Sequence, residues 1–363
     1  MTDDKALVLG ASGFLGSHVV KALVAEGRSG LTPGIRDDIH SPMTGQRPSD
    51  GPGRFPRGWF VVGFSEELEP GQVRPARYFD RDLVIWRTSS GEARVFDAHC
   101  PHLGAHLGHG GKVEGDSIRC PFHAWGFDAS GKCTDIPYAK RIPPKAQVRS
   151  WPALERNGMV MIWHDPAGGP PEDYVPSVKE FGDDGWTPWV HRTAQIKTHP
   201  REVVENVADI AHFGPIHGNE VLDFEASFDG TTATQSTHTT GYDKKGRLTK
   251  QSTVATYYGP AIQFSKMDGE FNTVIVNAHT PIDEGHLELR MGLLVQGIDY
   301  NTRTGRLLGD MWIDALQSGY FQDVAIWEHK QWRDEPMLCD GDGPIGDLRQ
   351  WYAQFYEDQS PED

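Results

Sequence analysis

Two short motifs, each pairing one cysteine with one histidine, constrain this chain more than any other feature of its sequence. The first is Cys100-x-His102 and the second is Cys120-x-x-His123, with 17 residues between them. Thiolates and imidazoles together can bind either zinc or an iron–sulfur cluster. Zinc fingers usually pair Cys with Cys and His with His along the chain, whereas here each motif supplies one of each. The pattern therefore favours a two-iron, two-sulfide cluster in which one iron binds both thiolates and the other binds both imidazoles.

Short apolar runs separated by turn residues surround these motifs, as in Gly58–Gly63, Leu83–Trp86 and Gly158–Trp163. Such runs predict the strands of a small all-β domain. Several glycines between the motifs allow tight loops whose backbone N–H groups can point at sulfur. With its ligand motifs, this region resembles the Rieske domain. The resemblance implies that Cys100, His102, Cys120 and His123 hold a [2Fe-2S] cluster, and it leaves His99, His106 and His109 outside the ligand positions.

A second cluster of metal-binding side chains follows in the next two hundred residues. Asp209, His212 and His217 fall within one turn-rich helical stretch, Glu205 to His217. On a regular helix two histidines five residues apart would diverge by about 140°. We expect Pro215 to end or bend the helix between them, so that both rings converge. The spacing also argues against a zincin, whose histidines are four apart on an unbroken helix.

Two imidazoles with one carboxylate would form the facial arrangement that leaves open positions for O2 on ferrous iron. A predicted helix that starts near Leu307 contains the carboxylate candidates. The pattern leaves four of them open, Asp310, Asp314, Asp323 and Glu328.

The chain from about residue 58 to 357 resembles the oxygenase components of bacterial 3-ketosteroid 9-alpha-hydroxylases, and also the cholesterol 7-desaturases. The resemblance extends beyond the metal ligands, to Asp135–Tyr138, Val148–Trp163 and Leu348–Tyr356. It implies that Asp323 is the third iron ligand, with Fe(II) held by His212, His217 and Asp323. It further implies that Asp209 bridges the iron site to His123 of a neighbouring subunit in a homotrimer. Asn206 is expected near the iron, or in a capping or packing role.

The expected fold class is α+β. A Rieske domain at residues 58–165 precedes a catalytic domain at residues 166–363, in which a long helix lies across an antiparallel sheet in a helix-grip arrangement. Strands are predicted at Thr231–Thr240, Ser252–Tyr258, Thr273–Ala278 and His286–Gly297. The pocket between sheet and helix is the expected substrate site. Its candidate lining residues, for which ordinary sheet core is the alternative, are Tyr257, Tyr258, Phe264, Met267 and Phe271.

The N-terminal segment has a different pattern. An apolar strand followed by Gly10, Gly13 and Gly16 and a helical segment resembles the start of a short-chain dehydrogenase or epimerase. No second strand and no acidic ribose ligand follow in the Gly- and Pro-rich residues 30–57. We interpret residues 1–29 as a truncated Rossmann-like strand–loop–helix fragment that does not bind a nucleotide.

Composition limits the partners and the location. The 363 residues carry a net charge of -16, which disfavours nucleic acid and anionic membranes. No apolar run approaches the roughly 20 residues of a membrane helix. The acidic, Gly-interrupted N-terminus is not a secretory signal, and of the four cysteines Cys133 and Cys339 are expected as free thiols. We expect a cytoplasmic protein without an integral membrane segment.

The expected function, implied by the resemblance, is O2-dependent hydroxylation or desaturation of a sterol or steroid. Electrons would come from NADH through a separate reductase that carries flavin, ferredoxin or both. An aromatic-ring dioxygenase or a demethylase of the same architecture is the nearest alternative. A Rieske electron-transfer protein without oxygenase activity and an NAD-dependent dehydrogenase are alternatives of other classes.

Overall fold

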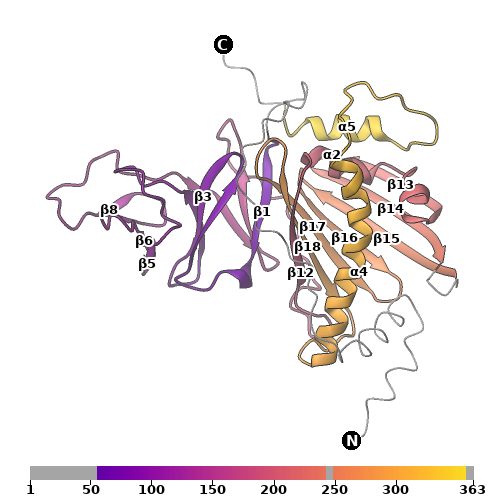
Figure 1. The fold of residues 1–363 in the computed structure, drawn as a ribbon, viewed down its shortest axis with the longest axis horizontal. Helices are drawn as coiled ribbons and strands as arrows, with labels where there is room; N and C mark the ends of the chain where they lie inside the picture. The colour runs from indigo at the N-terminus through magenta and orange to yellow at the C-terminus, as the bar shows by residue number, and fades with distance from the viewer. Residues whose placement is uncertain (1–54, 243–247, 357–363) are drawn as a thin grey trace, which may run out of the picture.

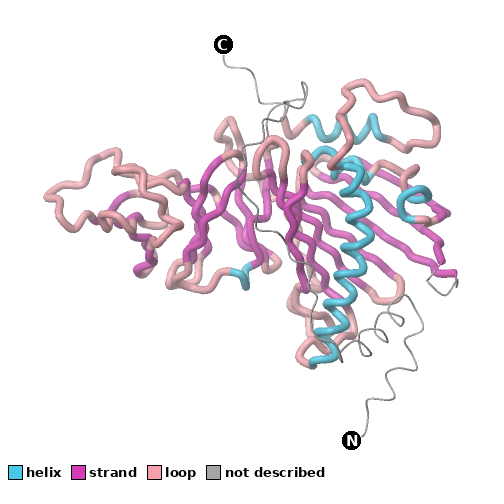
Figure 2. Tube along the Cα trace, in the orientation of Figure 1, coloured by secondary structure: helices cyan, strands magenta, loops and turns pink. Residues whose placement is uncertain are grey.

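The computed structural model describes residues 55–242 and 248–356, which form two sheet-rich halves side by side (Figures 1 and 2). Strands dominate both halves and helices are few. The predicted Rossmann-like fragment at residues 1–29 and nearly all of the linker at residues 30–57 lie outside the described residues. None of the helices in the described ranges is long and apolar enough to span a membrane.

The first half contains three small antiparallel sheets. One sheet has the order β1-β11-β10, the second β2-β3-β4-β9 and the third β5-β6-β7-β8. Their bounds are Gly58–Phe64 (β1), Val73–Tyr78 (β2), Arg81–Arg87 (β3), Ala93–Asp97 (β4), Lys112–Glu114 (β5), Ser117–Arg119 (β6), Gly126–Phe127 (β7), Cys133–Asp135 (β8), Ser150–Trp151 (β9), Ala153–Arg156 (β10) and Met159–His164 (β11). A single 3-10 turn, η2 (Ser65–Glu67), follows β1.

Strand β3 explains why this half holds together. Because side chains alternate between the two faces of a strand, Leu83 and Ile85 pack into the core beneath β1, while Val84 and Trp86 pack under the sheet that carries the cysteine–histidine loops. All four side chains are at most 1% exposed. The apolar run Leu83–Trp86 is therefore continuous, not alternating, because both of its faces are buried.

The second half is built on one seven-stranded antiparallel sheet, in the order β12-β18-β17-β16-β15-β14-β13. The strands are Val190–Ile196 (β12), Glu220–Asp229 (β13), Thr232–Tyr242 (β14), Leu248–Tyr258 (β15), Ile262–Asp268 (β16), Thr273–Pro281 (β17) and Leu287–Val295 (β18). The helical elements are α2 (Pro200–Val204), η3 (Glu205–Val207), α3 (Phe213–His217), α4 (Arg303–Trp327) and α5 (Ile345–Ala353). The long helix α4 crosses one face of the sheet (Figure 1).

The other face of this sheet packs against the first half. Val274, Val276 and Ala278 of β17 contact Trp59 of β1 and Met161 of β11 in one apolar core. The intervening residue Ile275 packs with Trp312 of α4 instead. The large sheet is thus the middle layer of the molecule, between the β1–β11 sheet and α4.

This layering corrects part of the predicted substrate pocket. Tyr258 and Phe264 lie in the core shared with β1, on the side away from α4. Met267 and Phe271 pack with Trp312 on the α4 side. Two of the predicted lining residues are therefore wrong, because a one-residue step along a strand moves a side chain to the opposite face.

Candidate metal centres

The first candidate centre lies in two loops of the first half that have the same backbone pattern. In each loop the cysteine N–H donates to the carbonyl five residues later, from Cys100 to Ala105 and from Cys120 to Trp125, both at 2.9 Å. The carbonyl of each cysteine accepts the N–H four residues later, from Gly104 and Ala124. Those two residues have left-handed φ angles of 74° and 57°. The matched turns present one cysteine and one histidine each.

The side chains of the two loops meet in pairs, cysteine beside cysteine and histidine beside histidine. Cys100 and Cys120 are 2% and 4% exposed, and the ring centroids of His102 and His123 lie 4.6 Å apart. The His102 ring stacks on Trp125 with centroids 4.7 Å apart, and the Trp125 indole donates to the Tyr138 hydroxyl at 2.8 Å. Trp125 thus orients a histidine.

These side chains suit a metal cluster. The buried Nδ1 of His102 has no hydrogen-bond partner within the described ranges. A buried ring nitrogen normally has one, so a partner such as a metal ion is missing here. Burial, together with the nearby thiol of Cys120, raises the pKa of the Cys100 thiol to about 12. A buried thiol of this kind ionises only beside compensating positive charge. Iron bound by these thiolates would supply that charge.

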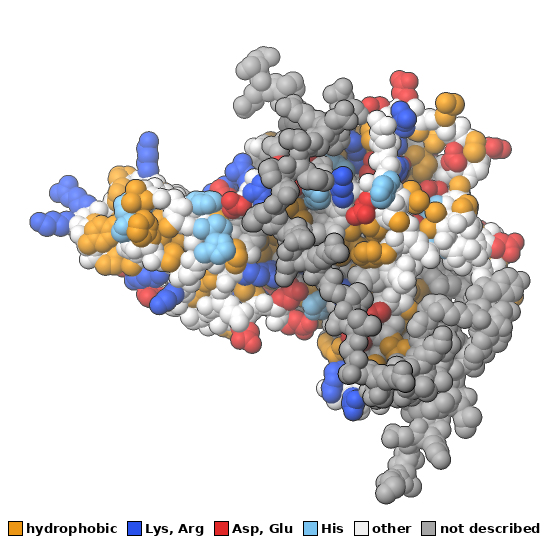
Figure 3. Space-filling model, in the orientation of Figure 1, with side chains coloured by type: hydrophobic (Ala, Val, Ile, Leu, Met, Phe, Trp, Pro, Cys, Tyr) orange, Lys and Arg blue, Asp and Glu red, His pale blue; other side chains and the backbone are white. Residues whose placement is uncertain are grey.

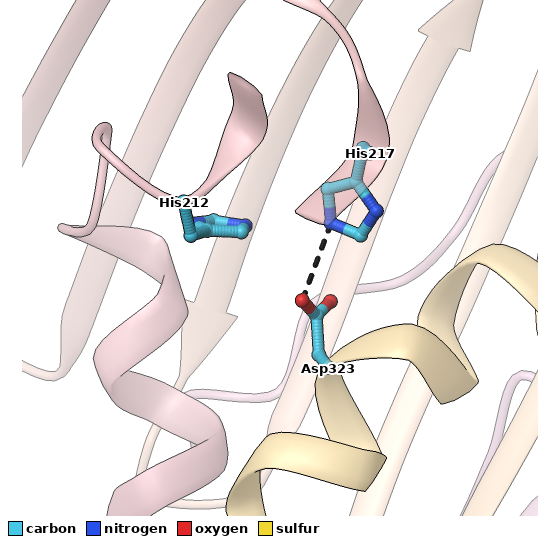
Figure 4. Close-up of side chains that lie close together, drawn as sticks. All are labelled: His212, His217 and Asp323. Carbon is cyan, nitrogen blue, oxygen red and sulfur yellow. Dashed lines mark ion pairs between the residues drawn. The ribbon is translucent and has the colours of Figure 1, made fainter. Parts of the chain in front are cut away.

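The second candidate centre joins α3 to α4. Ligand atoms of His212, His217 and Asp323 all lie within 4.8 Å of one another. The Nε2 of His217 is 3.3 Å from Oδ1 of Asp323, as Figure 4 shows. This carboxylate raises the pKa of His217. Asp323 itself is 6% exposed.

The histidine rings are oriented by their other nitrogens. Nδ1 of His212 donates to the carbonyl of Asp209 at 2.8 Å, and Nδ1 of His217 donates to Oε1 of Gln322 at 2.9 Å. Both Nε2 atoms then carry the lone pair that a metal needs. The sequence had not pointed to Gln322, although it directly precedes Asp323.

The other acidic candidates have different partners. Asp310 and Asp314 bind Arg192 at 3.1 and 3.0 Å, and Glu328 accepts the backbone N–H of Lys197 at 3.1 Å. Of the four predicted carboxylates, Asp323 is the one that meets the two histidines.

The predicted role of Pro215 is wrong. The chain leaves the helical conformation before His212, and a new helix, α3, runs from Phe213 to His217 with Gly218 (φ 68°) as its C-cap. Pro215 lies in the first turn of α3, where proline is tolerated because the N–H it lacks would have no helical partner. The rings converge because His212 precedes α3 and His217 ends it.

Two further predicted site residues lie beside this centre. Oδ1 of Asp209 accepts the backbone N–H of His212 at 3.2 Å. Although burial opposes it, the interaction with His212 lowers the pKa of Asp209. Asn206 is half-buried in η3, and the contacts found within residues 55–242 and 248–356 include none between its side chain and the three candidate ligands.

The two candidate centres lie in different halves of the chain. Figure 1 shows the sheet with β5, β6 and β8 at one end of the molecule, and α4 in the other half. The end with the cysteine–histidine loops carries exposed apolar side chains next to histidines (Figure 3). Leu103, Phe122 and Tyr138, which lie in or near the two ligand loops in the sequence, are each more than 60% exposed.

Comparison with known proteins matches both halves to families. Residues 58–152 match the model of the Rieske [2Fe-2S] domain, and residues 162–356 match the 3-ketosteroid 9alpha-hydroxylase C-terminal domain. The chain is 39% identical over 327 residues to a 3-ketosteroid-9-alpha-monooxygenase oxygenase component of Rhodococcus rhodochrous, covering 85% of this chain and 83% of the relative. It is 32% identical over 338 residues to a cholesterol 7-desaturase of Ciona intestinalis, covering 86% of this chain and 71% of the relative.

A solved structure shares the fold at lower identity. Dicamba monooxygenase bound to dicamba superposes with a TM-score of 0.68 and 18% identity, covering 85% of this chain and 98% of that one. For the present chain, the matches give a Rieske [2Fe-2S] cluster and non-haem iron as cofactors, and O2 as the oxidant. With both halves matched and with relatives above 30% identity over most of its length, the chain belongs to the Rieske non-haem iron oxygenases, in the family of the 3-ketosteroid 9-alpha-hydroxylase oxygenase components.

Proposed function

We propose that this oxygenase hydroxylates or desaturates a sterol or steroid, with electrons delivered from NADH by a separate reductase. The observation that carries the proposal is the convergence of His212, His217 and Asp323 within 4.8 Å. The names of the relatives support the substrate class, since they are 3-ketosteroid monooxygenase components and a cholesterol desaturase. In the hydroxylation, a C–H bond, O2, two electrons and two protons give an alcohol and water.

The proposed ligands divide between the two centres. Cys100 and Cys120 would hold one iron of the cluster, and His102 and His123 the other. His212, His217 and Asp323 would hold the mononuclear iron. When bound, the cluster supplies single electrons and the mononuclear iron supplies open positions for O2 beside the substrate.

The residues around the mononuclear iron would fix its geometry. The carbonyl of Asp209 and the amide of Gln322 keep the protons on Nδ1 of the two histidines. The hydrogen bond at Nδ1 fixes the orientation of each ring, so both Nε2 atoms would point toward the metal position before the metal binds.

Asp209 is proposed to connect the iron site with the cluster of a neighbouring subunit, through the partner subunit's His123, in a homotrimer. Two observations support this. The Asp209 side chain is 36% exposed, with a lowered pKa that keeps it an ionised acceptor. The cluster end also exposes the apolar side chains of Leu103, Phe122 and Tyr138, as an interface would require.

The space between the sheet and α4 is the proposed substrate site, with Tyr257, Met267 and Phe271 as lining candidates. Two buried polar side chains on β17 support binding of a molecule with a hydroxyl or oxo group. Within the described residues, Oδ1 of Asn277 has no hydrogen-bond partner, and the His279 ring nitrogens have none of ordinary geometry, although the ring lies near the Pro260 carbonyl. A polar group of the substrate would satisfy them.

Anaerobic metal and sulfide analysis, with electron paramagnetic resonance of the reduced protein, tests the proposal first. Wild type should hold about three irons and two sulfides per chain, and a His212→Ala/His217→Ala double variant about two irons. Two irons in both proteins would leave only an electron carrier. Product analysis with steroids then separates steroid oxidation from aromatic dioxygenation or demethylation.

A further inference from the structure

A cavity that is open to solvent lies between α2–η3 and α5. Its apolar walls are Val204, Leu348 and Tyr352, and Trp332 closes one side. None of the proposed ligands of either metal centre lines it. We propose that this cavity binds an amphipathic monoanion, a carboxylate on an apolar chain, at a site separate from the iron.

Arg201 is the side chain that requires such a ligand. It lines the cavity and is only 9% exposed. Its Nε has no hydrogen-bond partner within the described part of the chain, and the nearby Glu202 carboxylate stays 4.0 Å away. Its guanidinium lies over the Trp332 ring, 4.0 Å from the centroid. A buried charged donor without an acceptor is costly, so an anion placed here would be bound strongly.

The charges around the cavity leave one positive charge in excess. Glu205 pairs with Lys330 at 3.0 Å and with Arg349 at 2.8 Å, and Glu202 pairs with Lys330 at 2.8 Å. Counting only residues 55–242 and 248–356, two carboxylates face three cations, and Arg201 is the cation whose nearest carboxylate is as far as 4.0 Å away. One uncompensated guanidinium favours a monoanion over a dianion, and its planar donors suit a carboxylate.

The rest of the cavity defines the body of the ligand. The Tyr356 side chain is 6% exposed and lines the cavity. Its hydroxyl oxygen lies beside the Tyr352 hydroxyl, but the hydroxyl has no partner of ordinary hydrogen-bond geometry among the described residues, so its proton can be donated to the carboxylate. The remaining walls are mainly aliphatic and aromatic, which selects an apolar chain.

Calorimetric titration of the metal-loaded full chain with octanoate tests the site. Octanoate should bind with one-to-one stoichiometry. Acetate, which lacks the apolar chain, and 1-octanol, which lacks the carboxylate, should each bind at least about tenfold more weakly. Arg201→Gln should weaken octanoate binding at least about tenfold. The matched control Arg306→Gln, an exposed arginine of α4, should not change it.

A second variant keeps the test decisive if Arg201→Gln fails to fold. Ala353→Leu adds three carbon atoms to the wall of the cavity and narrows it, while leaving Arg201 and all proposed metal ligands in place. It should abolish octanoate binding and keep the metal content of wild type. Equal binding of 1-octanol and octanoate, unchanged binding by Ala353→Leu, or no binding at millimolar octanoate would each overturn the site.

Discussion

At the scale of single residues, Asp209 is the proposed link between the two metal centres. Asp209→Ala should keep the iron and sulfide content of wild type, because no proposed ligand is lost. Steady-state turnover should fall about 10–100-fold, as is typical when a supporting contact of a metal site is removed. Asp223→Ala, an exposed aspartate of β13, is the control. Normal turnover by Asp209→Ala would exclude the bridging role.

His279 should make stability depend on pH. It is fully buried, and burial lowers its pKa to about 3 from an ordinary 6.5. The His279 side chain therefore binds a proton near pH 6.5 in the unfolded chain but stays neutral at that pH in the folded protein. The free energy of unfolding should fall by about 1.4 kcal/mol per pH unit from this group as pH drops below 6.5.

Chemical denaturation between pH 5 and pH 7 measures this effect. His279→Leu should remove that part of the slope, whereas His329→Leu, at an exposed position after α4, should retain it. The same slope in His279→Leu and wild type would show that other groups cause the dependence. His164, whose pKa burial lowers to about 4, should contribute a similar slope in both proteins.

At the scale of elements, the two ligand loops allow opposite substitutions to be compared at equivalent positions. Ala124 has a left-handed φ of 57° and Gly104 one of 74°. A side chain in that conformation costs about 1 kcal/mol. Ala124→Gly should therefore be stabilising or neutral, while Gly104→Ala should cost about 1 kcal/mol, since no neighbouring atom lies within 4 Å of the added methyl group.

Denaturant unfolding followed by cluster absorbance compares these variants. Ala105→Gly, next to Gly104 but without a left-handed φ, should lose about 0.5–1 kcal/mol. Equal losses for Ala124→Gly and Ala105→Gly would contradict the argument from φ.

Helix α4 supplies both a proposed ligand and a residue that orients another. Gln322→Leu should weaken ferrous iron binding about 10–100-fold, because Nδ1 of His217 loses its acceptor. Competition with a chelator measures this affinity. Gln317→Leu, elsewhere on α4, should bind iron like wild type. Equal iron affinity in both variants would mean that Gln322 does not orient His217.

Particular residues show what the sequence could predict. The cysteine–histidine loops were recognisable because their ligands lie close in sequence, as do His212 and His217. The residue pattern left four carboxylates open for the third position, because a contact between α3 and α4 spans more than 100 residues; the family resemblance selected Asp323. Strand β13 had no prediction, since its residues alternate between exposed and half-buried and lack an apolar run.

At the scale of the whole molecule, the separation of the two centres within one chain makes subunit complementation the informative test. A Cys100→Ala/Cys120→Ala variant should lack the cluster, and an Asp323→Ala variant should lack the mononuclear iron. Each alone should be inactive. Co-expression should restore activity if electrons pass between subunits, because mixed oligomers combine an intact cluster with an intact iron site.

The control for complementation is mixing the two variants after separate purification, which should restore little activity if subunits exchange slowly. No activity after co-expression, despite mixed oligomers, would place electron transfer within one chain.

The position of β17 in the middle layer has a consequence for how such an enzyme can diverge. Val274, Val276 and Ala278 contact the first half of the chain, while Ile275, Asn277 and His279 alternate with them and point to the opposite side. If the substrate lies where we propose, mutations at the second set should change ligand preference while leaving the docking of the two halves intact. One strand thereby separates the positions proposed to face the ligand from those that join the two halves, which gives directed evolution a short set of sites to vary first.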